Sequence, residues 1–233
     1  MRGILVRIGI DASAGGWNAP VDPHTGKFVY VPIPETIQNS RDGYQRTYEE
    51  ILPALEEFGV SLPPHLSGLP MHLDPDFSYL SYGDCYPRNI PLHSCKSGDF
   101  LVFYAGLKPV VPGFRGLVYA LVGFFLIDEI VPSLAVPPEK WHENAHTRRR
   151  PDAMDLIVRA VPEKSGRFTH CIPIGEYRNR AYRVKESVLR EWGGLTVKDG
   201  YLQRSGRLPG FREPDRFLDW LSERSPVLTR TNF

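Results

Sequence analysis

The amino-acid sequence predicts an α+β fold with a small mixed β-barrel core and a few peripheral helices. Its 233 residues include 22 prolines and 21 glycines, which favour short strands joined by turns over a bundle of helices. The segment 98–105, "GDFLVFYA", places a Gly-Asp turn before a strand that is apolar on both faces, as inside a closed or doubly covered sheet. A longer apolar run follows at 117–130, and Gly123 in its middle suits a bulge or a barrel corner.

The amino-terminal part of the chain is expected to form two strands and one helix. β-Branched residues predict strands over 2–10 and 28–34, and the prolines of the second strand place it at a sheet edge. A helix is predicted over 47–59, because Thr47 and Glu50 can form a capping box at its start. An ordered but irregular connector is expected to follow this helix.

Strands dominate the rest of the predicted fold, with two short helices near the carboxyl end. The strands are expected over 99–105, 115–128, 154–161 and 166–173, and the helices over 184–192 and 214–224. The sequence has no internal repeat and no low-complexity tract, so a single domain over 1–233 is expected. Its barrel core would span about 95–175, between an amino-terminal elaboration (1–94) and a basic, helical one (176–233).

The composition argues against a membrane protein and against a disulfide framework. The longest apolar stretch, 117–127, has 11 residues, well short of the roughly 20 that a membrane span needs. The first residues do not resemble a signal peptide, so a cytoplasmic protein is expected. Cys85, Cys95 and Cys171 form no C-x-x-C pair, and they are expected to be free thiols. Cys171 follows a histidine and could act as a nucleophile, but neighbouring strand residues point to opposite faces, which favours a buried thiol.

Charge is distributed unevenly along the chain. Residues 1–140 carry 10 Lys and Arg against 15 Asp and Glu, whereas residues 141–233 carry 18 against 12, and the overall formal charge is +1. Arginine outnumbers lysine 21 to 7, and its planar guanidinium suits phosphates and base edges. The basic part therefore suits an anionic polymer such as DNA or RNA, although a plain solvated surface would have the same composition.

The apolar segments resemble the centre of the PUA-like superfamily. A Gly-Asp strand, here "GDFLVFYA", followed by a long bent strand with an acidic end, here "LVYALVGFFLIDEI", is similar to the arrangement in its EVE, ASCH and YTH branches. This resemblance covers about 35 residues of the chain. It implies a small β-barrel that binds RNA or DNA, often with a flipped or modified base in a pocket.

A second resemblance spans residues 8–130. The blocks "IDASAGGWNAPVDPHTGKFVYVPIPE", "HLDPDF", "GDFLVFYAGLKP" and "LVYALVGFFLIDEI" occur in the order found in the third nucleotide-modification-associated domain family. That resemblance implies a genomic context of base modification, and possible protein partners from a modification system. The opening "VRIGIDASAGG" departs from the family's usual "SRKGFDS", so no role is carried over for the Ser or Lys of that motif.

The segment "MHLDPDF" holds the most suggestive polar cluster. In an extended chain His72, Asp74 and Asp76 would lie on one face, because alternate residues do. With Asp11 as a further carboxylate, they could hold Mn²⁺, Mg²⁺ or Zn²⁺ and activate a water at a phosphodiester. These four residues are also the candidate catalytic groups. The alternative is turn chemistry, in which the Asp side chains cap backbone amides and the intervening proline fixes a bend.

A second set of side chains is suited to binding a nucleotide. Aromatic rings stack on bases, amides pair with base edges and arginines neutralise phosphates. The candidates are Trp17, Asn18, Tyr104, Trp141, Asn144, Arg178, Arg180 and Arg183. A structural role for the loop of Trp17 and a solvated charged face for the arginines are the alternatives.

The segment "KWHENAH" around Trp141 also fits the letters of the zincin motif H-E-x-x-H. Such a site requires a regular helix that projects both histidines to one zinc, and this segment has no apolar helical face. A polar surface loop that contacts nucleic acid is therefore favoured.

Two functions from different classes remain open. The first is a nucleic-acid-binding protein of a base-modification context that recognises a modified or flipped nucleotide. The alternative is a metal-dependent nuclease or nucleotide-modifying enzyme that uses the His/Asp cluster. A scaffold within a modification complex would leave no distinct mark in the sequence.

Overall fold

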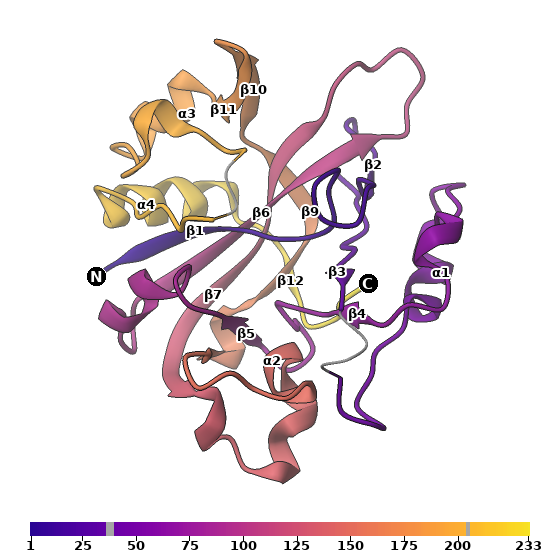
Figure 1. Ribbon diagram of the computed structural model, residues 1–233. Coiled ribbons are helices and arrows are strands. Elements are labelled where there is room, and N and C mark those ends of the chain that lie inside the picture. The colour runs from indigo at the N-terminus through magenta and orange to yellow at the C-terminus, as the bar shows by residue number, and fades with distance from the viewer. Residues whose placement is uncertain (36–39, 204–205) are drawn as a thin grey trace.

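The computed structural model describes residues 1–35, 40–203 and 206–233, and a large mixed sheet dominates it (Figure 1). The strands are β1 (Gly3–Arg7), β2 (Pro20–Val21), β3 (Ile33–Pro34), β4 (Met71–His72), β5 (Ser81–Asp84), β6 (Phe100–Pro109), β7 (Val118–Pro132), β8 (Leu156–Ala160), β9 (Gly166–Pro173), β10 (Gly175–Arg178), β11 (Ala181–Val184) and β12 (Leu228–Thr229). The α-helices are α1 (Leu52–Glu56), α2 (Ala145–Arg148), α3 (Glu186–Glu191) and α4 (Pro214–Arg224). The fold is therefore α+β with few helices, as the sequence predicts.

The main sheet has the order β1-β6-β7-β8-β5, and β2, β9 and β12 join it at the side of this path. β1 runs parallel to β6, whereas β6, β7 and β8 pair in antiparallel fashion. Among the described residues, no pairing joins β1 to β5, so the order is open and the PUA-like barrel stays a prediction. The predicted bulge lies beside Gly123, where the register of β7 shifts against both β6 and β9.

Both faces of this sheet are covered, as the apolar pattern of the central strands predicts. Successive residues of β6 point to opposite faces. Leu101 and Phe103 pack in one hydrophobic cluster, whereas Phe100 and Val102 pack in the other. The second cluster includes Phe217 of α4, and Figure 1 shows α3 and α4 together on one side of the sheet. The central strands are thus fixed between two layers and give the site a rigid support.

The helix predicted over 47–59 is present in a shorter form. A 3₁₀ turn over Tyr48–Ile51 leads into α1, and Thr47 and Glu50 form the predicted capping box. The helix predicted over 214–224 coincides with α4 and has Pro214 in its first turn. Among the described residues, no helix has the length and apolar character needed to span a membrane.

The strand predicted over 28–34 forms only in part. Ile33 and Pro34 pair with Met71 and His72 as β3 and β4. Residues 28–31 are buried in the core. They are joined to other segments mainly by single backbone hydrogen bonds, such as the one from Val29 N to Pro20 O at 3.1 Å. The prolines of this segment lack the backbone donors that a longer ladder needs. The short β3–β4 ladder nevertheless fixes the position of His72.

The last residues of the chain hold the segment that follows Asp74. Asn232 donates to Asp76 Oδ1 at 2.9 Å and accepts from the Phe77 backbone at 2.7 Å, and its side chain is buried.

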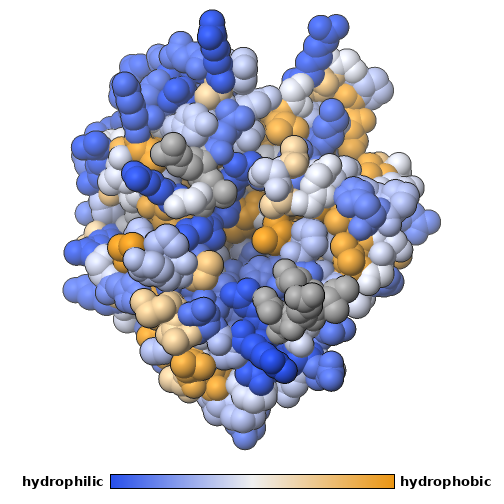
Figure 2. Space-filling model, in the orientation of Figure 1, coloured by the Kyte–Doolittle hydropathy of each residue, from blue (hydrophilic) through white to orange (hydrophobic). Residues whose placement is uncertain are grey.

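The face drawn in Figure 2 is mainly hydrophilic and is hollowed near its middle.

Candidate metal centre

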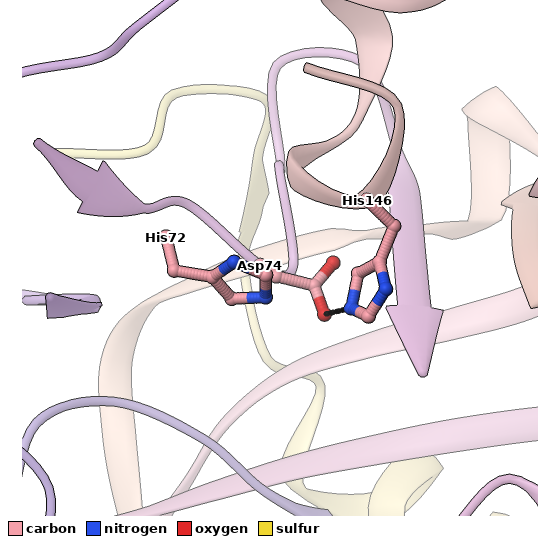
Figure 3. A group of neighbouring side chains, drawn as sticks. All are labelled: His72, Asp74 and His146. Carbon is pink, nitrogen blue, oxygen red and sulfur yellow. Dashed lines mark ion pairs between the residues drawn. The ribbon is translucent and has the colours of Figure 1, made fainter. Parts of the chain in front are cut away.

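His72, Asp74 and His146 come together from two distant parts of the chain (Figure 3). One ligand atom from each side chain lies within 4.8 Å of the others. His72 ends β4, Asp74 follows it by two residues, and His146 belongs to α2. The alternation of an extended segment places His72 and Asp74 on the same side, as predicted.

Asn144 connects His146 to the segment that carries His72 and Asp74. It is the N-cap of α2, and its Oδ1 accepts the backbone N–H of His146 at 2.8 Å. Its amide nitrogen donates to Asp74 Oδ1 at 2.9 Å and to Ser81 Oγ at 3.1 Å. The side chain that starts the helix therefore also holds the carboxylate in place.

Each imidazole has a carboxylate on its Nδ1 side. His72 Nδ1 lies 2.5 Å from Glu35 Oε2, and His146 Nδ1 lies 2.8 Å from Asp155 Oδ2. Because an ionised carboxylate only accepts, these contacts favour the tautomers with a proton on Nδ1 and a free lone pair on Nε2, whereas the Arg149 guanidinium, 3.0 Å from His146 Nδ1, opposes this tautomer at His146. Carboxylate partners of this kind orient the histidines of metal centres and raise their basicity.

Asp74 presents one oxygen to the group and keeps the other fixed. Its Oδ1 accepts from Gly83 N at 2.7 Å as well as from Asn144, whereas its Oδ2 lies 3.9 Å from His146 Nε2. Burial raises the pKa of Asp74 to about 7, and His72 and the two amide donors oppose this rise. A bound cation would compensate the buried negative charge.

His146 is neutral and ready to act as a ligand. Burial lowers its pKa to about 4, although the hydrogen bond to Asp155 opposes the shift. Metals bind the neutral imidazole, so no proton has to leave this ring at neutral pH.

The sheet approaches His146 closely at Gly83 of β5. A Cβ atom on Gly83 would lie 2.3 Å from His146 Cδ2 and 2.7 Å from Asn144 Oδ1. Only glycine leaves room for the two side chains at this point of the strand.

A pocket of about 440 Å³ contains the three side chains. Besides them it is lined by the arginines Arg7, Arg88 and Arg149, with further acidic, backbone and apolar groups. Arg88 pairs with Asp84 at 3.2 Å, and Arg149 pairs with Asp155 at 2.9 Å. The pocket is thus polar, and charged side chains of both signs surround the group of ligands.

Two histidines and one carboxylate form a donor set typical of catalytic metal sites. Zinc hydrolases and non-haem iron oxygenases both use three such protein ligands and keep further positions open for water or substrate. Because the three ligands lie in an open pocket, a ligand from solution could occupy those positions.

The other two predicted ligands lie outside the group of three. Asp76 is fully buried and pairs with Arg148, in addition to its bond from Asn232. The chain bends after Asp74 and turns at 77–80, so the alternation on which the prediction rests ends there. Asp11 lines the same pocket, but its Oδ2 pairs with Arg7 at 2.6 Å.

Several predicted nucleotide-binding residues have structural contacts. Asn18 donates to the Gly106 carbonyl at 2.7 Å, and buried Tyr104 donates to the Leu202 carbonyl at 2.8 Å. Trp17 packs against the core, and the Arg41 guanidinium lies 3.5 Å from the ring centre of Trp141. Among the residues described as lining the 440 Å³ pocket, none of Trp17, Asn18, Tyr104, Trp141 and Asn144 is found.

The predicted arginines lie on the β10–β11 hairpin. Arg178 and Arg183 both pair with Asp199, at 2.7 and 3.4 Å, and Arg178 also pairs with Glu176. Arg180 is exposed in the turn between the two strands.

The zincin-like letters do not form a zincin helix. A 3₁₀ segment over Pro138–Glu143 ends before Asn144, and α2 then begins. His142 is exposed and its ring contacts Tyr79 at 5.0 Å between centroids, away from His146 in the buried group. The sequence interpretation considered His146 only as a zincin-type ligand together with His142 and did not group it with His72 and Asp74, although H-x-D followed by a distant histidine is a usable signal. The three cysteines are free, and burial raises the pKa of Cys171 to about 12.

In comparisons with known proteins, the chain matches one family model. The family model described as nucleotide modification associated domain 3 matches residues 2–208. No curated protein matches the chain, and no solved structure does either.

Proposed function

The chain belongs to the nucleotide modification associated domain 3 family, and from this premise we propose that it is a metal-dependent enzyme that modifies nucleotides. The observation that carries the proposal is the group of His72, Asp74 and His146 inside an open polar pocket. A structural metal would be enclosed by four protein ligands, whereas a catalytic one keeps a position for substrate.

The proposed ligands are His72 and His146 through Nε2 and Asp74 through Oδ2. A divalent metal supplies Lewis acidity, or activates a bound water or oxygen, according to its identity. Glu35 and Asp155 hold the imidazole protons on Nδ1, and Asn144 keeps the carboxylate turned toward the histidines. The carboxylates and the amide thus fix the donor atoms before a metal arrives.

The surrounding arginines support a nucleotide as the substrate. Arg7, Arg88 and Arg149 line the pocket, each paired with one carboxylate. A guanidinium has five N–H donors, so each can also bind a phosphate or a base edge. DNA and RNA bases are both compatible with this chemistry. Nucleic-acid binding, the other function that the sequence predicts, is then the way in which the enzyme holds its substrate.

Metal binding tests the proposal directly. We expect metal-free protein to bind Mn²⁺, Fe²⁺ or Zn²⁺ at one site in isothermal titration calorimetry. His146→Ala and Asp74→Asn should each weaken metal binding by more than about 100-fold. Loss of a group that only hydrogen-bonds to a metal ligand weakens binding by about 10–100-fold. DNA and RNA are then incubated with the protein and digested to nucleosides. Mass spectrometry of the nucleosides identifies the product.

His142→Ala is the matched control, because His142 precedes α2 and its exposed ring lies outside the group. This variant should bind the metal as the unaltered protein does. If the unaltered protein binds no divalent metal, the enzyme proposal fails. Metal-independent binding of oligonucleotides would then favour a protein that only recognises nucleic acid.

A further inference from the structure

A further hollow of about 380 Å³ is present besides the 440 Å³ pocket that contains the candidate metal ligands (the metal pocket). Its lining includes three cationic side chains and one aromatic ring: Arg183, Lys198, Arg207 and Tyr201. We call this feature the basic hollow. Among the described residues that line it, none is acidic.

The basic hollow and the metal pocket share one segment of chain. Gly206 lines the metal pocket, and the next residue, Arg207, lines the basic hollow. This segment continues along the edge of β1, where Leu5 N donates to the Pro209 carbonyl at 2.8 Å. Phe211 N donates to the Gly3 carbonyl at 2.9 Å and extends the attachment. An extended molecule that entered the metal pocket would therefore have the basic hollow next to it.

The cations of the basic hollow are suited to an anionic ligand. Lys198 and Arg207 are exposed, and within the described parts of the chain neither forms an ion pair. Arg183 is held more firmly, since it pairs with Asp199 and donates to the Lys198 carbonyl at 3.3 Å. The hollow thus combines one guanidinium held by an ion pair with two solvent-exposed cations, an arrangement that favours phosphates.

Tyr201 adds a flat surface between these charges. Its side chain is half-buried, and the Arg183 guanidinium lies 5.4 Å from the ring centre. Sites for single-stranded nucleic acid pair a positive groove with aromatic rings on which the bases stack. Small anionic metabolites need the cations but gain little from such a ring.

We propose that the basic hollow binds the nucleic-acid strand next to the nucleotide that enters the metal pocket. The inference rests on the proposed function and narrows it, because the substrate is then a nucleotide within a single strand and not a free nucleotide. Arg183, Lys198 and Arg207 contact phosphates, and Tyr201 stacks on a base.

Oligonucleotide binding tests this inference without any need for turnover. Fluorescence anisotropy would follow a fluorescein-labelled 12-residue single-stranded DNA, and the RNA of the same sequence, over a range of salt. We expect Lys198→Glu with Arg207→Glu to weaken binding at least about tenfold and to reduce the salt slope by about one to two units. Tyr201→Ala should weaken binding about tenfold, whereas Tyr201→Phe keeps the ring and the affinity.

Lys27→Glu with Lys164→Glu is the charge-matched control. Both lysines are exposed and line neither hollow, so this variant reports the effect of overall charge alone. Equal losses in the two double variants would overturn the inference. So would affinity for the 12-residue strands no higher than that for a mononucleotide.

Mn²⁺ titration of the same proteins separates the two proposals. The basic-hollow variants should bind Mn²⁺ as the unaltered protein does, because none of the changed residues belongs to the metal group. Strand binding that depends on the hollow, in a protein that binds none of Mn²⁺, Fe²⁺ and Zn²⁺, would overturn the enzyme proposal alone. Mn²⁺ binding with strand affinity unaffected by the variants would overturn the basic-hollow inference alone.

Discussion

Asp11 illustrates how one carboxylate organises a loop at the edge of the metal pocket. Its Oδ2 pairs with Arg7, and its Oδ1 accepts from Ser13 and from the Ala14 backbone at 2.8 Å. Burial raises the pKa of Asp11, but the bonds from Ser13 and the charge of Arg7 outweigh it, so the pKa lies below 3.8 overall. The backbone amides of Ser13 and Ala14 are thus bound by a carboxylate of their own loop.

The stability that Asp11 contributes should depend on pH. Because folding lowers this pKa, the contribution is complete above the unfolded value and is lost as the pH falls through the folded one. Asp11→Asn should lower the free energy of unfolding by about 1–3 kcal/mol at pH 7. The difference should shrink below pH 3.8, as urea unfolding at a series of pH values would show. A pH-independent difference between Asp11→Asn and the unaltered protein would contradict the assignment.

Among the secondary-structure elements, β5 has the most direct influence on the metal group. Its backbone donates from Gly83 to Asp74 and lies against the His146 ring. β5 pairs with β8 from Ser81 to Asp84, so this position is fixed by the main sheet. The geometry of the ligands is therefore set by strand packing as well as by hydrogen bonds.

A methyl group at Gly83 should disturb the metal site more than the fold. Gly83→Ala places Cβ against the His146 ring, and the buried ring must move. We expect Mn²⁺ affinity to fall by about 10–100-fold, as when an outer partner of a ligand is lost. The measurement is calorimetric titration, with circular dichroism to confirm folding.

Gly210→Ala is the companion variant for this test. A Cβ at Gly210 would meet only ordinary contacts, the nearest at 3.6 Å from Thr196. It should leave Mn²⁺ affinity unchanged. Equal effects of the two substitutions would show that the close approach at Gly83 does not matter.

The whole molecule should gain stability from the metal. The ligands join the segment after β4 to α2, so a bound ion connects parts of the chain that are distant in sequence. An ion that binds only the folded state stabilises it by about 2.7 kcal/mol at 100 times its dissociation constant. For a chain of this size the melting temperature should rise by roughly 5–10 °C. Differential scanning calorimetry with Mn²⁺ and with a chelator would measure this, and His146→Ala should show no rise.

Much of this architecture can be read from local patterns. The nearly continuous apolar sequences of β6 and β7 predict a sheet covered on both faces, and Thr47 with Glu50 predicts a helix start. Both follow from residues near one another in the chain, and both are confirmed. The short β4 and β5 strands were not predicted, because two to four residues carry little pattern and their partners are remote.

The same distinction between local and distant contacts applies to the candidate site. His72 and Asp74 are recognisable from their spacing, since one extended segment carries both. Their separation from Asp76 depends on a bend that spacing does not reveal. His146 joins them only because Asn144 caps α2 and bonds to Asp74, a contact that no local pattern predicts.

The bond network of Asn232 has a consequence for any shortened version of this chain. The family match ends at residue 208, but α4 contributes Phe217 to the core and Asn232 binds Asp76 beyond that point. A fragment cut at residue 208 would expose apolar surface and free the turn that follows Asp74. The family match and the unit that folds around this pocket therefore end at different residues.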